Sequence, residues 1–147
     1  MRVLVQEAPF DLAEETTRFA KGEGGSGAIV TFTGVVRDND AGTLIAMEIE
    51  HYPGMTEKAL REIAEHAVGR FELQDALVIH RYGRLVPGEQ IMMIATAARH
   101  RRSAFEAAEF LMDYLKSRAP FWKREITAEG EAWVAAKDED EAALERW

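Results

Sequence analysis

Two lysines in the C-terminal third of the chain are the first candidates for chemistry. Lys116 lies in the last turn of a predicted helix, and Lys123 follows seven residues later, beyond Ala119 and Pro120. Proline disfavours helical geometry in the residue before it, so the chain must reverse between the two lysines. If the next segment packs back along the domain, both ammonium groups face one pocket, where burial and mutual repulsion lower a lysine pKa. Such a lysine is a usable base or nucleophile at neutral pH; alternatively, Lys116 only stabilises the C-terminus of its helix.

A second candidate is an anion site at the start of the same helix. The run from Arg99 to Arg102 precedes Ser103, so free backbone N–H groups, the positive end of the helix dipole and several cations converge there. Within this run, His100 could donate a hydrogen bond to an anion or shuttle a proton. Phosphate or carboxylate would bind at such a site. The alternative is that the arginines extend into water or pair with Glu106 and Glu109.

The length of this helix separates the two candidates. Arg101 and Lys116 are 15 residues apart, which corresponds to about 22 Å along a helix that rises 1.5 Å per residue. One copy of the chain therefore cannot readily hold a single small ligand with both side chains. A large ligand or two separate sites would satisfy this spacing, but we favour a dimer in which a second subunit brings its Arg101 to the first subunit's Lys116.

The charge distribution agrees with a localised anion site. The chain has 18 Lys and Arg against 26 Asp and Glu, a formal net charge of −8. Between residues 99 and 124, seven cations face three anions, a local charge of +4 that leaves −12 for the rest of the chain. Nucleic-acid binding requires a broad basic surface with aromatic stacking platforms, so this clustering disfavours that function.

Sulfur and metal chemistry are restricted by what the chain lacks. It contains no cysteine, which excludes a thiol nucleophile, a Cys-ligated zinc site and an iron–sulfur cluster. The four histidines have no spacing that would ligate a metal from one helix face, so we expect no metal and no bound cofactor. We interpret His66 and His80 as structural, whereas His51 before a turn could be either. Any sulfur must arrive with a partner or a ligand.

Length and composition indicate one globular domain. With 147 residues, 47% hydrophobic and 30% charged, the chain is long enough to bury a core of its own. Its N-terminal segment, MRVLVQEAPFDL, lacks the basic start and apolar run of a secretion signal, and no stretch is apolar enough to span a membrane. We therefore expect a cytoplasmic protein.

Short strands and helices must position these residues. Apolar alternation and turn signals predict strands and helices in the order strand–helix, two strand–strand–helix units, and two final strands around Gly130. The strands are expected at 2–6, 28–36, 44–51, 76–82 and 90–97, and the helices after Asp11, from Thr56 to about Arg70, and from Ser103. The strands at 76–82 and 90–97 are close enough for a hairpin. This order predicts a single α+β domain with mostly antiparallel pairing.

Two further segments carry specific expectations. Ser103 and Glu106 form an S-x-x-E capping box, and five apolar residues give the following helix a buried stripe: Ala104, Ala107, Ala108, Leu111 and Leu115. Residues 22–27, GEGGSG, match no phosphate-binding or dinucleotide-binding motif, so we expect a flexible connection. Residues 137–147 are expected to form an acidic C-terminal tail, solvated at Asp138–Glu141.

Segments across nearly the whole chain resemble a known family, the catalytic large subunit of molybdopterin synthase. They are TFTGVVR (31–37), EHYPGMTEKAL (50–60), HRYGRLVPGE (80–89), HRRSAFEAAEFLMDYLKSRAPFWKRE (100–125) and the terminal RW. The long run that ends in APFWKRE is the most specific of them. This resemblance implies one α/β hammerhead-like domain over 1–147 with additional antiparallel β-structure.

The resemblance also implies an assembly and a reaction. Members of the family form a homodimer that carries one small ubiquitin-like sulfur-carrier subunit at each end, a heterotetramer overall. The implied enzyme is a sulfurtransferase of molybdenum cofactor biosynthesis. It transfers two sulfurs from the thiocarboxylate on the carrier's C-terminal Gly-Gly tail to cyclic pyranopterin monophosphate, which forms the dithiolene of molybdopterin. A protein that positions such a donor needs no thiol of its own.

Residue roles follow from the resemblance position by position. The catalytic lysines of the family fall on Lys116, near the entering carrier tail, and Lys123, beside the pterin as acid, base or electrostatic stabiliser. Its phosphate-binding arginine falls on Arg37, with Val35 close by where relatives can carry a lysine. Its His-Arg pair falls on His100 and Arg101, which the other subunit could supply, and Phe32 and Met112 are expected to line the pocket. The competing interpretation is a non-catalytic binding module that keeps the fold; the intact candidate residues argue against it.

Overall fold

The computed structural model describes residues 1–22 and 24–147, and within them the strands form two four-stranded sheets. The first sheet has the order β1 (Arg2–Gln6), β4 (Asp75–Arg81), β6 (Gln90–Ala98) and β2 (Ala28–Val35). The second has the order β5 (Gly83–Leu85), β3 (Ala46–His51), β7 (Phe121–Thr127) and β8 (Gly130–Trp133). Only β1 and β4 pair in parallel among the described strands. The predicted α+β class with mostly antiparallel pairing is confirmed.

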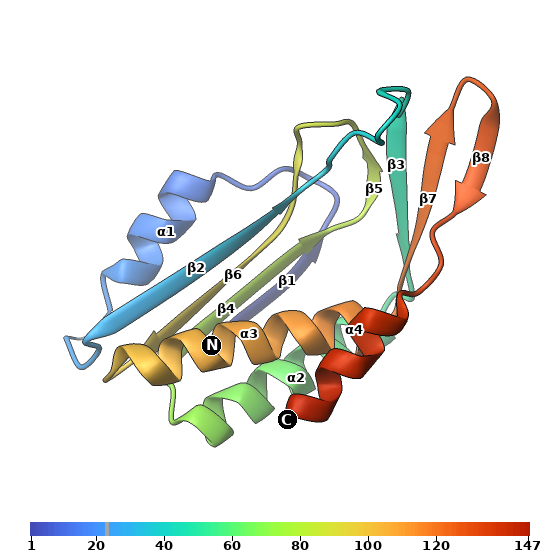
Figure 1. Ribbon diagram of the computed structural model, residues 1–147. Helices are drawn as coiled ribbons and strands as arrows, with labels where there is room; N and C mark the ends of the chain where they lie inside the picture. The colour runs from blue at the N-terminus through green and yellow to red at the C-terminus, as the bar shows by residue number, and fades with distance from the viewer. Residues whose placement is uncertain (23) are drawn as a thin grey trace.

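Helices cover both faces of the first sheet (Figure 1). On one face, α1 (Leu12–Ala20) packs Phe19 against alternate residues of β4 and β6, such as Ile79 and Met93. On the other face, α2 (Met55–Phe71) and α3 (Arg101–Arg118) enclose the main core with the intervening residues, such as Val78 and Ile94. Because successive strand side chains point to opposite faces, the continuous apolar runs of β4 and β6 supply both cores.

The chain passes from the first sheet to the second between β4 and β6. The predicted pairing of these two strands is confirmed, with Val78 opposite Ile94. Their connection is not the simple hairpin loop that was predicted, because it contains β5, which begins at Gly83 and pairs with β3 in the other sheet. Gly83 has a φ of 89°, a left-handed conformation that glycine adopts without steric cost. The strand β5 was not predicted, since three residues carry too little periodicity.

Helix α3 runs along the first sheet toward the second sheet (Figure 1). Its predicted apolar stripe is buried as expected. The predicted capping box at Ser103 is wrong: the helix begins at Arg101, its N-cap is His100, and no side chain caps it. Because the helix begins two residues earlier than predicted, Ser103 lies inside the first turn, and the Glu106 carboxylate instead accepts from Arg102 Nε at 2.9 Å.

The C-terminal segment folds back onto α3, and its acidic run stays on the surface, with Asp138, Glu139 and Glu141 exposed as predicted. Residues Asp138–Ala143 form the helix α4, and a 3₁₀ turn follows at Leu144–Arg146. The Ser117 hydroxyl donates to the carbonyl of Asp140 at 3.0 Å, and Arg118 pairs with Glu141 at 2.7 Å. The acidic helix therefore lies beside the basic C-terminal end of α3 (Figure 1).

The last two residues anchor this segment. Arg146 pairs with Glu109 at 2.6 Å and with Asp113 at 2.7 Å on α3. The Trp147 indole Nε1–H donates to the same Asp113 at 2.8 Å, and its ring packs edge-on against Phe110 with centroids 5.5 Å apart. Opposite charge and an apolar ring therefore hold the end of the chain against α3.

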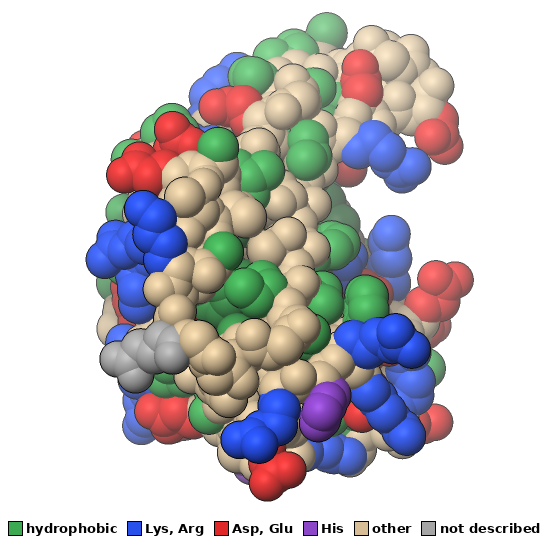
Figure 2. Space-filling model, turned by 90° about the vertical axis from the view of Figure 1, so that its left-hand side faces the viewer, with side chains coloured by type: hydrophobic (Ala, Val, Ile, Leu, Met, Phe, Trp, Pro, Cys, Tyr) green, Lys and Arg blue, Asp and Glu red, His purple; other side chains and the backbone are tan. Residues whose placement is uncertain are grey.

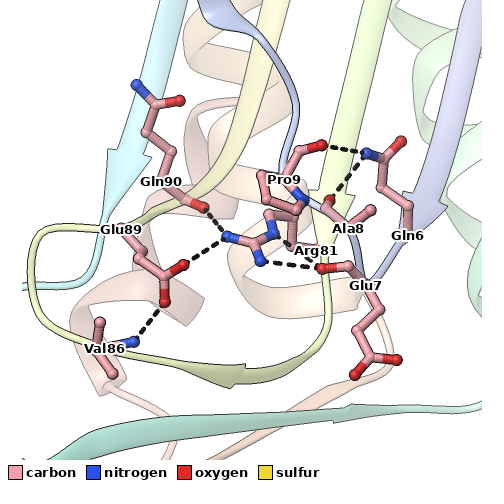
Figure 3. A network of polar contacts seen from close by, with 8 residues as sticks. All are labelled: Gln6, Glu7, Ala8, Pro9, Arg81, Val86, Glu89 and Gln90. Carbon is pink, nitrogen blue, oxygen red and sulfur yellow. Dashed lines mark hydrogen bonds and ion pairs between the residues drawn. The ribbon is translucent and has the colours of Figure 1, made fainter.

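A polar network around Arg81 joins two loops at the end of the first sheet, the one after β1 and the one between β5 and β6 (Figure 3). The guanidinium is buried and donates to the carbonyl of Glu7 from Nε at 3.1 Å and from a terminal nitrogen at 3.0 Å. It also donates to the Gln90 carbonyl at 3.3 Å and pairs with Glu89 at 3.5 Å. Glu89 in turn accepts from the Val86 N–H at 2.7 Å. Each loop that meets here is thereby held to β4.

Candidate active site

The structure brings Lys116 and Lys123 together. Lys116 is exposed in the last turn of α3, and Lys123 is half-buried on β7 after the reversal at Pro120. Burial lowers the pKa of Lys123, and the positive charge of Lys116 lowers it further. Two groups of the C-terminal segment also act on it: Asp140 raises this pKa and Lys137 lowers it. The expected approach of the two ammonium groups is therefore present, with Lys123 as the more buried of the pair.

Neither lysine has an acidic partner within the described part of the chain. No carboxylate of residues 1–22 or 24–147 lies within 4.0 Å of either ammonium group. Unneutralised cations of this kind favour an anionic ligand.

Three arginines of the same basic segment are neutralised instead. Arg102 pairs with Glu106 on its own helix, and Arg118 pairs with Glu141 of α4. On the second sheet, Arg124 lies 3.1 Å from Glu131 and 3.6 Å from both Glu48 and Glu50, and 5.1 Å from the centre of the Trp133 ring. These three arginines stabilise the fold through their ion pairs. The cations of the basic segment that remain available to a ligand form two groups, one at each end of α3.

The second group contains His100 and Arg101 at the start of α3. Both are exposed, and no side-chain hydrogen bond caps this end of the helix. A Cβ at Gly27 would overlap the Arg99 carbonyl, so only glycine allows the chain before β2 to pass this close to the loop between β6 and α3. Because α3 is continuous from Arg101 to Arg118, these side chains lie about 22 Å from Lys116 along the helix axis. The structure does not bring the two groups together within one chain.

Arg37, Phe32 and Met112 approach from other elements. Arg37 follows β2 and is exposed. Phe32 lies on β2 opposite Ile94, so its side chain shares the face of the first sheet that α3 covers, and 43% of it is exposed. Met112 on α3 is half-buried against the main core. The exposed Phe32 side chain beside α3 is therefore available for an apolar contact with a ligand.

One histidine that we interpreted as structural lies next to the lysine pair. His80 on β4 is buried, with 6% of its surface exposed, and stacks on Phe121 with ring centroids 3.7 Å apart and planes at 17°. Burial lowers its pKa to about 4, and the charges of Lys123 and His51 lower it as well. The sequence did not predict this position, because the stacking of His80 on Phe121 joins strands of different sheets. The available signal in the sequence was the HRYGR run after an apolar strand.

The molecular surface is hollowed near the junction of its upper and lower parts. Figure 2 shows this hollow with Lys and Arg side chains on both of its sides and hydrophobic side chains close by.

Within residues 1–22 and 24–147, no three His, Asp or Glu side chains are grouped so that they could hold a metal ion. In the same residues, no helix has both the length and the apolar character needed to cross a membrane.

Comparison with known proteins identifies the family. The profile of the family described as MoaE protein matches residues 5–118. The chain belongs to the MoaE family. The molybdopterin synthase catalytic subunit of Cereibacter sphaeroides is 69% identical over 147 residues, which is the whole of both chains.

Solved structures of MoaE proteins share the fold. The molybdopterin biosynthesis MoaE protein of Burkholderia ambifaria has 50% sequence identity and a TM-score of 0.84, covering 99% of this chain and 96% of its own. Molybdopterin synthase from Staphylococcus aureus has 29% identity and a TM-score of 0.82, covering 90% of this chain and 96% of its own. The resemblance found in the sequence, and the fold that it implied, are thereby confirmed.

Proposed function

We propose that this chain is the catalytic subunit of a molybdopterin synthase and that sulfur transfer takes place at its lysine pair. The observation that carries the site assignment is the half-buried Lys123, whose pKa is lowered by burial and by Lys116. A carrier thiocarboxylate and a cyclic pyranopterin monophosphate are both anions, and neither lysine has a carboxylate partner within the described residues. The chain contains no cysteine, so the sulfur belongs to the donor throughout.

The two lysines have different roles in this proposal. Lys116, exposed at the end of α3, attracts the carboxyl end of the carrier's Gly-Gly tail. Lys123, more buried, acts beside the pterin as an acid, a base or an electrostatic stabiliser, because a lowered pKa brings an ammonium group closer to neutral-pH proton transfer.

The remaining candidates bind the substrate. Arg37 holds the phosphate, while Phe32 and Met112 form apolar contacts with the ring system. His100 and Arg101 come from the other subunit of a homodimer, since α3 keeps them about 22 Å from Lys116 in their own chain. With one small ubiquitin-like carrier subunit at each end, the assembly is a heterotetramer. Its cytoplasmic location stays a prediction, which cell fractionation tests.

The first experiment measures molybdopterin formation from cyclic pyranopterin monophosphate and thiocarboxylated carrier. Lys116→Ala and Lys123→Ala should each lower the rate at least about 100-fold, because general acid–base and electrostatic groups contribute at that scale. Lys58→Ala, on the exposed surface of α2, is the matched control and should keep the wild-type rate. A folded wild-type protein that binds the carrier but makes no product would instead indicate a binding module.

A mixing experiment tests the composite site. Lys123→Ala and Arg101→Ala are purified separately, then mixed under conditions that exchange subunits. If each site takes Lys123 from one subunit and Arg101 from the other, half of the sites in each mixed dimer are intact, and about a quarter of the wild-type activity returns at equal mixing. If both residues act within one chain, mixing restores nothing.

A further inference from the structure

His80 is a buried titratable group next to the lysine pair that the proposed function does not use. Its Nδ1 lies 2.7 Å from the carbonyl oxygen of Arg81. A carbonyl only accepts hydrogen bonds, so Nδ1 carries the proton in this contact. In the neutral ring the other nitrogen, Nε2, then has a free lone pair and is an acceptor. Burial favours this neutral form, because it disfavours the imidazolium.

The Nε2 atom has no partner in the described part of the protein. No hydrogen bond joins it to residues 1–22 or 24–147, in which the Nε of Arg124 is the only fully buried side-chain nitrogen or oxygen without a partner. Since Nε2 is not fully buried, it keeps contact with the solvent space despite the burial of the ring. An acceptor that is both fixed and accessible is available to a ligand.

The His80 ring lies close to the lysine pair. His80 stacks on Phe121 at 3.7 Å, and its packing therefore joins β4 of the first sheet to β7 of the second. Phe121 and Lys123 are two residues apart on β7, so their side chains emerge on the same face of that strand. The charged groups that act on His80 are Lys123 and His51, and Lys116 acts in turn on Lys123.

We propose that His80 Nε2 accepts a hydrogen bond from an N–H group of the heterocycle that binds beside Lys123, and thereby orients the ring for sulfur transfer. This inference rests on the proposed function. Phosphate and thiocarboxylate are acceptors and pair with lysine or arginine, whereas a pterin ring carries N–H donors that cations cannot satisfy. His80 Nε2, a neutral acceptor close to these cations, supplies the acceptor that a pterin N–H group requires.

Two substitutions separate this role from a structural one. His80→Asn keeps a donor near the position of Nδ1, toward the Arg81 carbonyl, and removes the acceptor at Nε2. His80→Gln places an amide oxygen near the position of Nε2. We expect the KM for the pterin substrate to rise about tenfold in His80→Asn, the scale of one lost hydrogen bond, and to recover within about threefold in His80→Gln. The KM for the carrier should not change in either variant.

Wild-type protein provides a measurement that does not depend on how the variants fold. In protein labelled with ¹⁵N at histidine, the resonance of the unprotonated His80 Nε2 should move upfield when cyclic pyranopterin monophosphate binds without the carrier. Variants of His51, His66 and His100 assign the resonance by elimination.

Three outcomes overturn the inference. They are an unchanged Nε2 resonance at saturating substrate, a wild-type KM in folded His80→Asn, or equal losses in the Asn and Gln variants. The proposed function remains when wild-type protein makes product in the same assay. If wild-type protein neither binds the substrate nor makes product, both the proposed function and this inference fail.

Discussion

The Arg81 network and the lysine pair place cations in two opposite surroundings. Arg81 is buried and donates to two backbone carbonyls and a carboxylate, so its charge is fully used in joining loops. Lys123 is half-buried, and within the described residues its neighbours include a second ammonium group, Lys116, but no carboxylate within 4.0 Å. A satisfied cation stabilises the fold, whereas an unsatisfied one costs stability and is available for an anion.

The strongest test of this contrast is a substitution that removes charge from the lysine pair. Lys123→Met should lower molybdopterin formation at least about 100-fold, while the free energy of unfolding stays the same or increases because burial disfavours the ammonium ion. Activity assays and urea unfolding measure the two effects. A large loss of stability would show that Lys123 supports the fold as Arg81 does.

The converse substitution should affect stability rather than chemistry. Arg81→Met removes the guanidinium donors of the network, so we expect the free energy of unfolding to fall by about 4 kcal/mol, since hydrogen bonds from charged groups contribute about 1.5–3 kcal/mol each. Urea unfolding measures this loss, and the rate per folded molecule should stay near that of the wild type. A folded Arg81→Met protein without activity would contradict the purely structural role of Arg81.

A pH experiment sharpens the comparison at His80. Its pKa falls from 6.5 to about 4 on folding, so below pH 6.5 the unfolded chain binds the proton that the folded protein excludes. The contribution of His80 to the free energy of unfolding is therefore complete above pH 6.5 and is lost progressively as the pH falls toward 4. Between pH 7 and pH 5 this one group should lower the free energy of unfolding by about 2 kcal/mol.

The control for the pH experiment is His66, which is exposed on α2. Urea unfolding of His80→Phe should lose this part of the pH dependence, whereas His66→Gln should retain it. Equal pH dependence in wild-type protein and His80→Phe would contradict the assignment.

The smallest effects are expected from surface ion pairs. Arg146 is about half-exposed and pairs with Glu109 and Asp113, so Arg146→Ala should lower the free energy of unfolding only slightly. Arg102→Ala, which removes a pair exposed on α3, should have almost no effect. A larger loss from Arg146→Ala would place the C-terminal segment with the Arg81 network as a principal support of the fold.

Most of the fold followed from local patterns. The strands expected at 2–6 and 90–97 match β1 and β6 within one residue, because alternation and turn signals are properties of adjacent residues. The start of α3 was wrong, since a capping box is only one way to begin a helix and His100 begins this one without a side-chain cap. The packing of the C-terminal segment against α3 was not predicted, because the residues that Trp147 contacts on α3 lie far from it in sequence.

The sequence by itself determined the family, the absence of thiol chemistry, and the cations at the two ends of α3, because motifs, composition and helix length are independent of long-range contacts. Only the tertiary structure decided which of these cations remain available. It brought Lys123 beside Lys116, neutralised Arg124 with carboxylates of neighbouring strands, and stacked His80 on Phe121 across two sheets. Each of these contacts joins separate elements, and the burial that shifts a pKa exists only after they have packed together.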